Sequence, residues 1–308
     1  MWIVVFEIMQ KVFIAYGSDG YLESLQRIGK EAKKLGIFSK VILYREKDMP
    51  LFIQASPLKA YGRGNGYWVW KPYIIWKTMQ DYPNSIVVYA DCGCTLQPNM
   101  EEWNKWFELL DTYDTLTFRY RLDYVYPWQE NNGTVMTTSV QWTKMSLIRY
   151  FDPLIKNRDW LQEAQVMGGV VLACRKSKLV KMWMDITLMH PELIMDCYGN
   201  ETIEQADCFR EHRHDQSMLS ALCAYWWNKG QVVKVLPETA DSCDNSAIVA
   251  TRKRILKNPI PLKTRIIQKI KDRIGDKGYN SIHDGFSKIK LFKKWVLHIE
   301  HKGAVSKR

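Results

Sequence analysis

The amino-acid sequence predicts an α/β fold in which helices flank a mixed central sheet. Two observations carry this prediction. Short runs rich in β-branched and aromatic residues alternate with longer segments whose apolar residues recur at helical spacing. The chain has 308 residues, of which 46% are hydrophobic and 25% charged, and this is enough for one sizeable globular core.

The first part of the chain has a βαβ pattern. Residues 11–16 (KVFIAY) predict a buried strand, which the turn 17–20 (GSDG) follows. Residues 21–35 have the apolar spacing of a helix, and Gly36 stands where a C-terminal cap is expected. Residues 40–44 (KVILY) predict the next strand. Because a helix joins the two strands, we expect them to be parallel.

The later elements continue the alternation of strands and helices. Further strands are predicted at residues 85–90, 115–120, 166–174 and 231–236, and further helices at residues 72–80, 101–110, 177–189 and 214–227. Residues 85–90 (SIVVYA) are the most strand-like run of the chain. The strand at 166–174 is entered through Gly168 and Gly169, which permit either a bulge or the close approach of a ligand or of another backbone.

Charge divides the chain at about residue 250. Residues 251–308 hold 17 Lys and Arg against 4 Asp and Glu, a net of +13, whereas the remaining 250 residues hold 27 against 29, a net of −2. We therefore predict a domain at residues 1–250 and a basic amphipathic helical tail at residues 251–308. The tail is expected to meet an anionic membrane surface, because its apolar residues suit a membrane better than nucleic acid. Packing of the tail on the body is the alternative.

The cysteines and the hydropathy pattern favour a cytoplasmic protein. The seven cysteines include no CxxC pair and no zinc-site spacing, which fits a reducing compartment. The apolar stretch Met1–Met9 is far shorter than a transmembrane helix needs, and Met9 is an alternative start. We expect the protein in the cytoplasm, either free or attached peripherally to the inner face of the cytoplasmic membrane.

A carboxylate follows directly after the most strand-like run. Asp91 ends the strand at 85–90, and Gly93 comes two residues later. Ligands of open α/β sheets bind beyond the carboxyl ends of the strands. Asp91 could there hold a divalent cation or a ribose hydroxyl, and Gly93 would let a phosphate approach the backbone. The alternative is that Asp91 is a turn residue.

A loop rich in glycine and aromatic residues lies upstream, at residues 63–72 (RGNGYWVWKP). In a binding loop, Tyr67 and Trp68 would stack on a base or sugar, and Arg63 and Lys71 would meet phosphate. The alternative is a loop that packs on the sheet.

A third cluster, at residues 211–216 (EHRHDQ), opens the helix predicted at 214–227. His212, His214, Asp215 and Gln216 offer metal ligands, acceptors for hydroxyl groups and a possible general base. Asp215 could instead be a residue favoured by the helix dipole.

The order of these motifs resembles that of bacterial GT-A-type glycosyltransferases from polysaccharide and lipopolysaccharide loci. The segments 64–72 (GNGYWVWKP), 89–93 (YADCG) and 212–219 (HRHDQSML) carry the resemblance, which covers residues 11–236. The chain is also distantly similar to glycosyltransferase family 8 and to DXD-type sugar transferases. The resemblance implies a GT-A-like, Rossmann-like sheet. It also implies transfer of a hexose from a nucleotide diphosphate sugar to a glycan or lipid-linked hydroxyl in surface polysaccharide synthesis.

The resemblance assigns roles residue by residue. Asp91 matches the first Asp of the DXD motif, and Gly93 stands where the second Asp would be, which leaves the usual ligand pair for Mn²⁺ or Mg²⁺ incomplete. Asp215 and Gln216 match a pair that faces the donor sugar, with His214 as a further catalytic candidate. On the acceptor side the candidates are Gly168, Gly169 and His212. Two ways remain to replace the missing charge: a histidine as metal ligand, or neutralisation of the diphosphate by Arg63 and Lys71.

Two other classes of protein compete with this interpretation. A nucleotidyltransferase acting on sugar phosphates would normally have a glycine-rich, lysine-containing loop after the first strand, and residues 17–20 (GSDG) contain no basic residue. A non-catalytic membrane- or nucleic-acid-binding module would rely on the tail alone. We expect no nucleic-acid partner.

Overall fold

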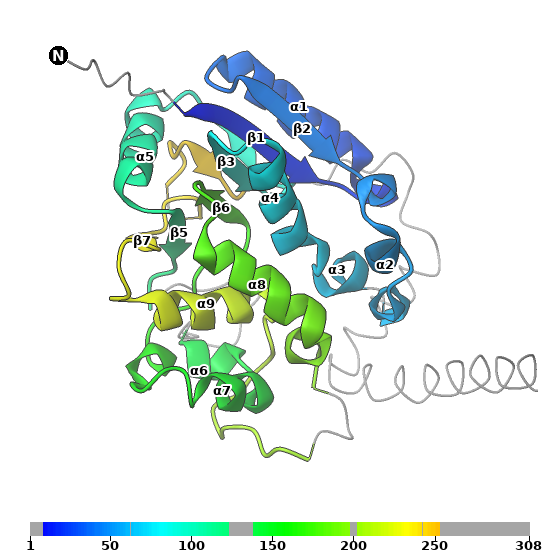
Figure 1. Cartoon of the computed structure of the whole chain (residues 1–308), viewed down its shortest axis with the longest axis vertical. Helices are drawn as coiled ribbons and strands as arrows, with labels where there is room; N and C mark the ends of the chain where they lie inside the picture. The colour runs from blue at the N-terminus through cyan, green and yellow to red at the C-terminus, as the bar shows by residue number, and fades with distance from the viewer. Residues whose placement is uncertain (1–8, 62, 123–137, 198–201, 242, 253–308) are drawn as a thin grey trace, which may run out of the picture.

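The structure is a computed structural model that describes residues 9–61, 63–122, 138–197, 202–241 and 243–252. Its centre is a six-stranded sheet of order β2-β1-β3-β6-β5-β7 (Figure 1). The strands are β1 (Gln10–Tyr16), β2 (Lys40–Tyr44), β3 (Ser85–Ala90), β5 (Thr115–Arg119), β6 (Val170–Ala173) and β7 (Lys234–Pro237). The β1–β2, β1–β3 and β5–β7 pairs are parallel, whereas β6 runs antiparallel to both of its neighbours. The predicted α/β class, with a mixed sheet flanked by helices, is therefore confirmed.

The βαβ pattern folds as the sequence predicts. Helix α1 (Leu22–Leu35) joins β1 to β2, and the two strands are parallel with Phe13 opposite Val41. Gly36 ends α1 in the left-handed conformation, with φ of 68° and its N–H bonded to the carbonyl oxygen of Lys33. This geometry is that of the expected cap.

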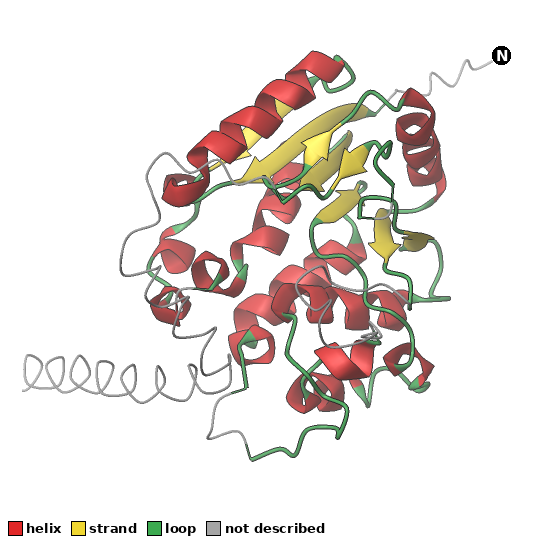
Figure 2. Ribbon diagram, turned by 180° about the vertical axis from the view of Figure 1, so that it is seen from behind, coloured by secondary structure: helices red, strands yellow, loops and turns green. Residues whose placement is uncertain are grey.

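Two groups of helices cover the two faces of the sheet (Figures 1 and 2). Alternate residues of β1 point to opposite faces, as the strand period requires. Phe13 packs in one apolar core with residues of α1 and α5 (Met100–Thr112). Ile14 packs in the other core with residues of α4 (Trp70–Asp81), α8 (Lys178–Met189) and α9 (His214–Trp226).

Several short elements were not predicted from the sequence. They are the helices α2 (Leu51–Gln54), α3 (Gly64–Tyr67), α6 (Ser139–Trp142) and α7 (Met145–Phe151), and the strands β4 (Thr95–Leu96) and β8 (Ile248–Val249). In Figure 1, α6 and α7 lie at the opposite end of the molecule from β1 and β2. Strands β4 and β8 form a separate antiparallel pair, with Thr95 opposite Val249. This pair carries residues 250–252 back to the turn that follows β3.

The predicted bounds are close to the observed ones for most elements. The strands at 40–44 and 85–90 begin and end as predicted. The strand predicted at 166–174 is shorter, because residues before Val170 leave the ladder and Val166 makes only an isolated bridge to Arg119. Residues 253–308 lie outside the described residues, so the predicted helical tail remains a prediction. Within the described residues, no helix is long and apolar enough to cross a membrane.

Candidate active site

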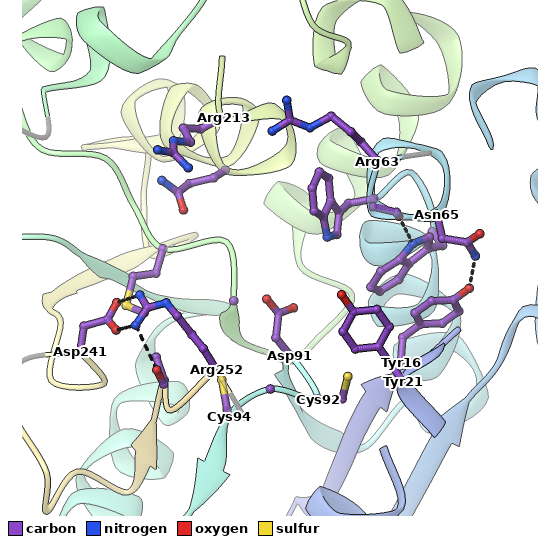
Figure 3. A pocket seen from close by; sticks show the side chains of 18 of the residues that line it. Tyr16, Tyr21, Arg63, Asn65, Asp91, Cys92, Cys94, Arg213, Asp241 and Arg252 are labelled. Atoms are coloured by element: carbon purple, nitrogen blue, oxygen red, sulfur yellow. Dashed lines mark hydrogen bonds and ion pairs between the residues drawn. The ribbon is translucent and has the colours of Figure 1, made fainter. Parts of the chain in front are cut away.

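A cavity of about 560 Å³ lies at the carboxyl ends of β1 and β3. Tyr16 is the last residue of β1 and Asp91 follows the last residue of β3, and both line it. Its aromatic residues are Tyr16, Tyr21, Trp68, Trp70 and Tyr120, and its charged residues are Arg63, Asp91, Arg213, Asp241 and Arg252. Figure 3 shows the Asp91 carboxylate pointing into the space between the two tyrosines and Arg252, with Arg63 and Arg213 on the opposite side. The place and size are those of a ligand site in an α/β sheet.

Asp91 is held where the β3–β6 ladder ends. Its backbone N–H donates to the carbonyl oxygen of Gly169 at 2.8 Å, and the Tyr89 hydroxyl donates to its Oδ1. A Cβ atom on Gly169 would lie 3.1 Å from Asp91 Oδ2, so a larger residue there would displace this carboxylate by a few tenths of an ångström. The Asp91 side chain is 44% exposed, which leaves the carboxylate open to a ligand. Gly93 lines the cavity beside it.

Lys71 lies behind the cavity surface and does not line it. It belongs to the first turn of α4, and its side chain is 2% exposed. Its Nζ donates to Asp215 Oδ2 at 2.5 Å and to the carbonyl oxygen of Gly168 at 2.9 Å, and lies 3.4 Å from Asp91 Oδ1. Burial alone would lower the pKa of Lys71, but the two carboxylates outweigh it and raise that pKa, so the ammonium stays charged. The structure thus gives Lys71 two carboxylate partners where we expected phosphate.

Asp215 and Gln216 lie in the first turn of helix α9, next to this lysine. Burial raises the pKa of Asp215, and the Lys71 ammonium opposes that effect. A Cβ atom on Gly168 would lie 3.2 Å from Asp215 Oδ2 and 3.2 Å from Gln216 Cβ. Gln216 lines the cavity, and its Nε2 donates to Gln165 Oε1 at 2.7 Å. The structure therefore brings Asp91, Lys71, Gly168, Gly169, Asp215 and Gln216 together.

The two histidines of the predicted cluster are buried and do not line the cavity. His212 Nε2 donates to the carbonyl oxygen of Leu193, and His214 Nδ1 donates to that of Ile194, both at 2.9 Å. Burial lowers the pKa of each ring well below its ordinary value, and neighbouring positive charges add to the shift. Neutral rings in these positions fasten the loop before α9 to residues 193–194. We find no place for either ring on the cavity surface.

The loop at 63–72 makes a left-handed turn. Residues 64–68 all have positive φ: Gly64 52°, Asn65 51°, Gly66 97°, Tyr67 54° and Trp68 57°. This turn separates two rings that the sequence grouped together. The Tyr67 ring is buried and its hydroxyl donates to Asp196 Oδ2 at 2.7 Å, whereas Trp68 lines the cavity and stacks on His214 with ring centroids 5.4 Å apart.

Arg63 lines the cavity but is already paired. Its two terminal nitrogens donate to Asp196 Oδ1 at 3.1 Å and to Glu211 Oε1 at 2.9 Å. Burial would lower the pKa of Arg63, and these two carboxylates raise it. The two carboxylates therefore fix the orientation of the Arg63 guanidinium at the edge of the cavity.

Other lining residues were missed in the sequence. Tyr16 stacks on Trp70 with centroids 3.8 Å apart, and its hydroxyl accepts from the Asn65 amide. Burial raises the pKa of Tyr16 to about 12. Tyr16 ends a predicted strand, so the rule that drew attention to Asp91 could have found it. Arg252 pairs with Asp241 at 2.6 Å, and no sequence signal indicates that contact, because it depends on the β4–β8 pair.

Arg213 precedes α9 inside the predicted cluster. Its guanidinium lies 4.3 Å from the centroid of the Trp142 ring and 3.8 Å from Glu211 Oε2. Arg213 and Arg252 add two positive charges to that of Arg63 around the cavity.

A divalent cation does not fit the carboxylates of this site. Mg²⁺ and Mn²⁺ prefer several oxygen ligands at about 2.1 Å. The facing oxygens Asp91 Oδ1 and Asp215 Oδ2 are instead shared by the Lys71 ammonium, and residue 93 is glycine. In the part of the chain that the structure describes, no three His, Cys, Asp or Glu side chains are grouped to hold a metal ion.

Comparison with known proteins gives similarity at low levels. No family model matches the chain, and no curated protein matches it. Solved structures similar to it include a glycosyltransferase involved in glycosylation of the major capsid of PBCV-1, with 11% identity over 59% of this chain and 69% of that one and a TM-score of 0.33. The galactosyltransferase LgtC, bound to donor and acceptor sugar analogues, has 12% identity over 73% and 72% and a TM-score of 0.34. Mouse xyloside xylosyltransferase 1, in its apo form, has 14% identity over 74% and 85% and a TM-score of 0.36.

Proposed function

We propose that the chain is a glycosyltransferase that moves a hexose from a nucleotide diphosphate sugar to a hydroxyl of a glycan or lipid-linked acceptor. One observation carries the proposal: a single cavity at the carboxyl ends of β1 and β3 combines an aromatic wall, three arginines and one open carboxylate. Rings suit a base or sugar, guanidinium groups suit a diphosphate, and a carboxylate suits sugar hydroxyls.

Each part of the donor has a matching part of the cavity. Tyr16 and Trp70 stack on each other and are almost fully buried, so the partly exposed rings of Tyr21 and Trp68 offer the base its surface. Asp91 accepts hydrogen bonds from ribose or sugar hydroxyls, and the Gly93 backbone allows close approach. Arg213 and Arg252 lie where they can balance the diphosphate charge.

The transfer step breaks the bond between the anomeric carbon and the diphosphate oxygen. The electron pair leaves with the nucleoside diphosphate, the acceptor oxygen bonds to the anomeric carbon, and the hydroxyl proton is released. Gln216 lines the cavity and would orient the sugar, with Asp215 behind it. Positive groups preorganised at the leaving diphosphate are the expected source of rate enhancement.

The basic tail gives a reason to place the reaction at a membrane. Thr251 and Arg252, the first two residues of the tail, lie at the cavity, where the Thr251 hydroxyl donates to the carbonyl oxygen of Gly93 at 3.0 Å. A tail bound to anionic lipid, at about 1 kcal/mol for each Lys or Arg near the surface, would hold the cavity close to lipid-linked acceptors. This arrangement fits surface polysaccharide synthesis at the inner face of a cytoplasmic membrane.

The first test is binding of UDP, GDP, CMP and TDP, each followed by thermal shift and calorimetry with and without Mn²⁺. We expect one nucleotide to bind and to raise the melting temperature, because binding to the native state alone stabilises it. Binding of none to the folded protein would contradict the proposal. Release of a nucleoside diphosphate from the matching sugar donor, without pyrophosphate, separates a glycosyltransferase from a nucleotidyltransferase.

Asp91→Ala tests the site directly. We expect transfer to fall by at least about 100-fold, because hydrogen bonds to a charged group contribute about 1.5–3 kcal/mol each. The unfolding midpoint should fall while the protein stays folded, because Lys71 and the Tyr89 hydroxyl each lose this partner but Asp215 still pairs with Lys71. Asp81→Ala is the matched control: its side chain is 44% exposed, like that of Asp91, and it lies on α4 paired with Lys77. Normal turnover by Asp91→Ala would sink the assignment of the site.

A further inference from the structure

Three charged groups stand in a row under the cavity. The Lys71 ammonium lies between Asp215 Oδ2, at 2.5 Å, and Asp91 Oδ1, at 3.4 Å. Its third contact is the carbonyl oxygen of Gly168, at 2.9 Å. Two of the three N–H donors of the ammonium group bond to Asp215 and to the Gly168 carbonyl oxygen, and the Asp91 carboxylate pairs with its charge.

Several elements of the fold contribute to the burial of Lys71. The left-handed turn at residues 64–68 aims the start of α4 inward, and the glycine pair at 168–169 lets the entry to β6 close over both carboxylates. An ammonium group taken out of water is costly unless carboxylates surround it. Here one carboxylate is buried with it, and the other faces the cavity with 44% of its side chain exposed.

This arrangement is incompatible with a divalent cation bound between the same carboxylates. A cation there would take the space of Nζ or would lie against an ammonium of like sign. Among the described residues, the other carboxylate that lines the cavity is that of Asp241, whose side chain is 2% exposed and paired with Arg252, and residue 93 is glycine. Of the residues that the structure describes, Arg63, Arg213 and Arg252 bring positive charge to the cavity lining.

We propose that Lys71 takes the place of the divalent cation in this site, so that the protein binds its donor and transfers the sugar without metal. The inference rests on the proposed function and states which positive groups act in it. Lys71 is a positioning residue: it fixes the Asp91 carboxylate that the donor contacts and keeps Asp215 from repelling it. The arginines at the cavity surface, which Asp196, Glu211 and Asp241 hold in place, then donate hydrogen bonds to the leaving diphosphate.

The experiment measures Mn²⁺ binding and nucleotide binding for the full chain. Mn²⁺ is followed by electron paramagnetic resonance of the free ion, with and without the nucleotide found in the panel. For the wild type we expect no Mn²⁺ binding below millimolar concentration, and nucleotide affinity that changes less than twofold between chelator and Mn²⁺. Mn²⁺ binding in the micromolar range that Asp91→Asn abolishes would overturn the proposal.

The Mn²⁺ affinity of Lys71→Ala separates the proposed role of Lys71 from a purely structural one, because a structural role would leave that affinity unchanged. Removing the ammonium leaves two carboxylates facing an empty space, which is a site for a divalent cation. We expect this variant to bind Mn²⁺ at least tenfold more tightly than the wild type, and its nucleotide binding to become dependent on Mn²⁺. Lys77→Ala, on the same helix and paired with Asp81 at the surface, is the control and should behave as the wild type.

Two further arms keep the outcome clear. If Lys71→Ala does not fold, Lys71→Gln retains a hydrogen-bond donor, and we expect it to bind Mn²⁺ more tightly than the wild type as well. A folded Lys71 variant that gains no Mn²⁺ binding would contradict the proposal. The resonance measurement of Mn²⁺ needs no donor. Failure of every nucleotide to bind would therefore count against the proposed function, whereas the Mn²⁺ results test this inference separately.

Discussion

Two adjacent glycines set the distance between the entry to β6 and both carboxylates of the site. A Cβ atom on Gly169 would lie 3.1 Å from Asp91 Oδ2, which is closer than side chains normally pack. We expect Gly169→Ala to turn the Asp91 carboxylate and to weaken nucleotide binding, and to cost at most about 1 kcal/mol of unfolding free energy, because the partly exposed carboxylate can move. Gly20→Ala is the control, because a Cβ atom there would have no neighbour within 4 Å. Urea unfolding and calorimetry check both variants, and equal results for the two would refute the crowding argument.

Single residues of the site were predictable where a local rule sufficed. Asp91 follows the most strand-like run, so its place at a carboxyl end follows from the sequence. Lys71 was expected to meet phosphate because it stands near glycines and aromatic residues. Its burial depends on left-handed φ angles at residues 65, 67 and 68, which non-glycine residues adopt rarely, and on two carboxylates distant in sequence. His212 and His214 have the residue types of a catalytic cluster, but the packing of residues 193–194 buries them.

At the scale of elements, the left-handed turn before α4 is the most strained feature near the cavity. Its Asn65, Tyr67 and Trp68 have positive φ, which costs roughly 1–2 kcal/mol for each residue. Gly66 has φ of 97°, and a Cβ atom there would meet nothing closer than 3.4 Å. We therefore expect Gly66→Ala to lower the free energy of unfolding by about 1–2 kcal/mol through conformation alone, and Gly66→Asn to cost less. Chemical denaturation checks the order Gly, Asn, Ala, and a neutral Ala variant would contradict it.

The elements themselves were predictable in proportion to their length. Helices α1, α4, α5, α8 and α9 have enough turns for an apolar face to be recognised in the sequence, and all five were predicted. Strands β4 and β8 have two residues each, which is too few for any period to appear. The antiparallel direction of β6 was also beyond the local pattern, since it is set by its ladders with β3 and β5. The long-range pairing of β4 with β8 brings Arg252 to the cavity wall beside Asp241.

At the scale of the whole molecule, the buried histidines make stability depend on pH. His212 and His214 join the loop before α9 to residues 193–194, and burial lowers the pKa of both rings well below the ordinary value. In the unfolded chain each ring takes up a proton near pH 6.5. Below that pH the unfolded state binds more protons than the folded state, so the free energy of unfolding falls as the pH falls toward the depressed folded pKa values. The slope reaches about 1.4 kcal/mol per pH unit for each ring.

We therefore expect the free energy of unfolding to be lower at pH 5.5 than at pH 7.5, by an amount that shrinks when either histidine is replaced. Asp215 acts in the opposite direction, because burial raises its pKa and the folded state then holds a proton more readily in acid. His212→Gln and His214→Gln remove a proton-binding group from the unfolded chain, although each lowers the stability at pH 7.5 by breaking a buried hydrogen bond. His190→Gln is the control, since His190 lies at the surface beside Glu192 with 39% of its side chain exposed.

Urea unfolding at pH 5.5 and pH 7.5 measures the difference in unfolding free energy for each variant. If the unfolding free energy of His212→Gln and of His214→Gln fell between pH 7.5 and pH 5.5 by as much as that of His190→Gln, the two buried histidines would not be the cause of the lower stability in acid.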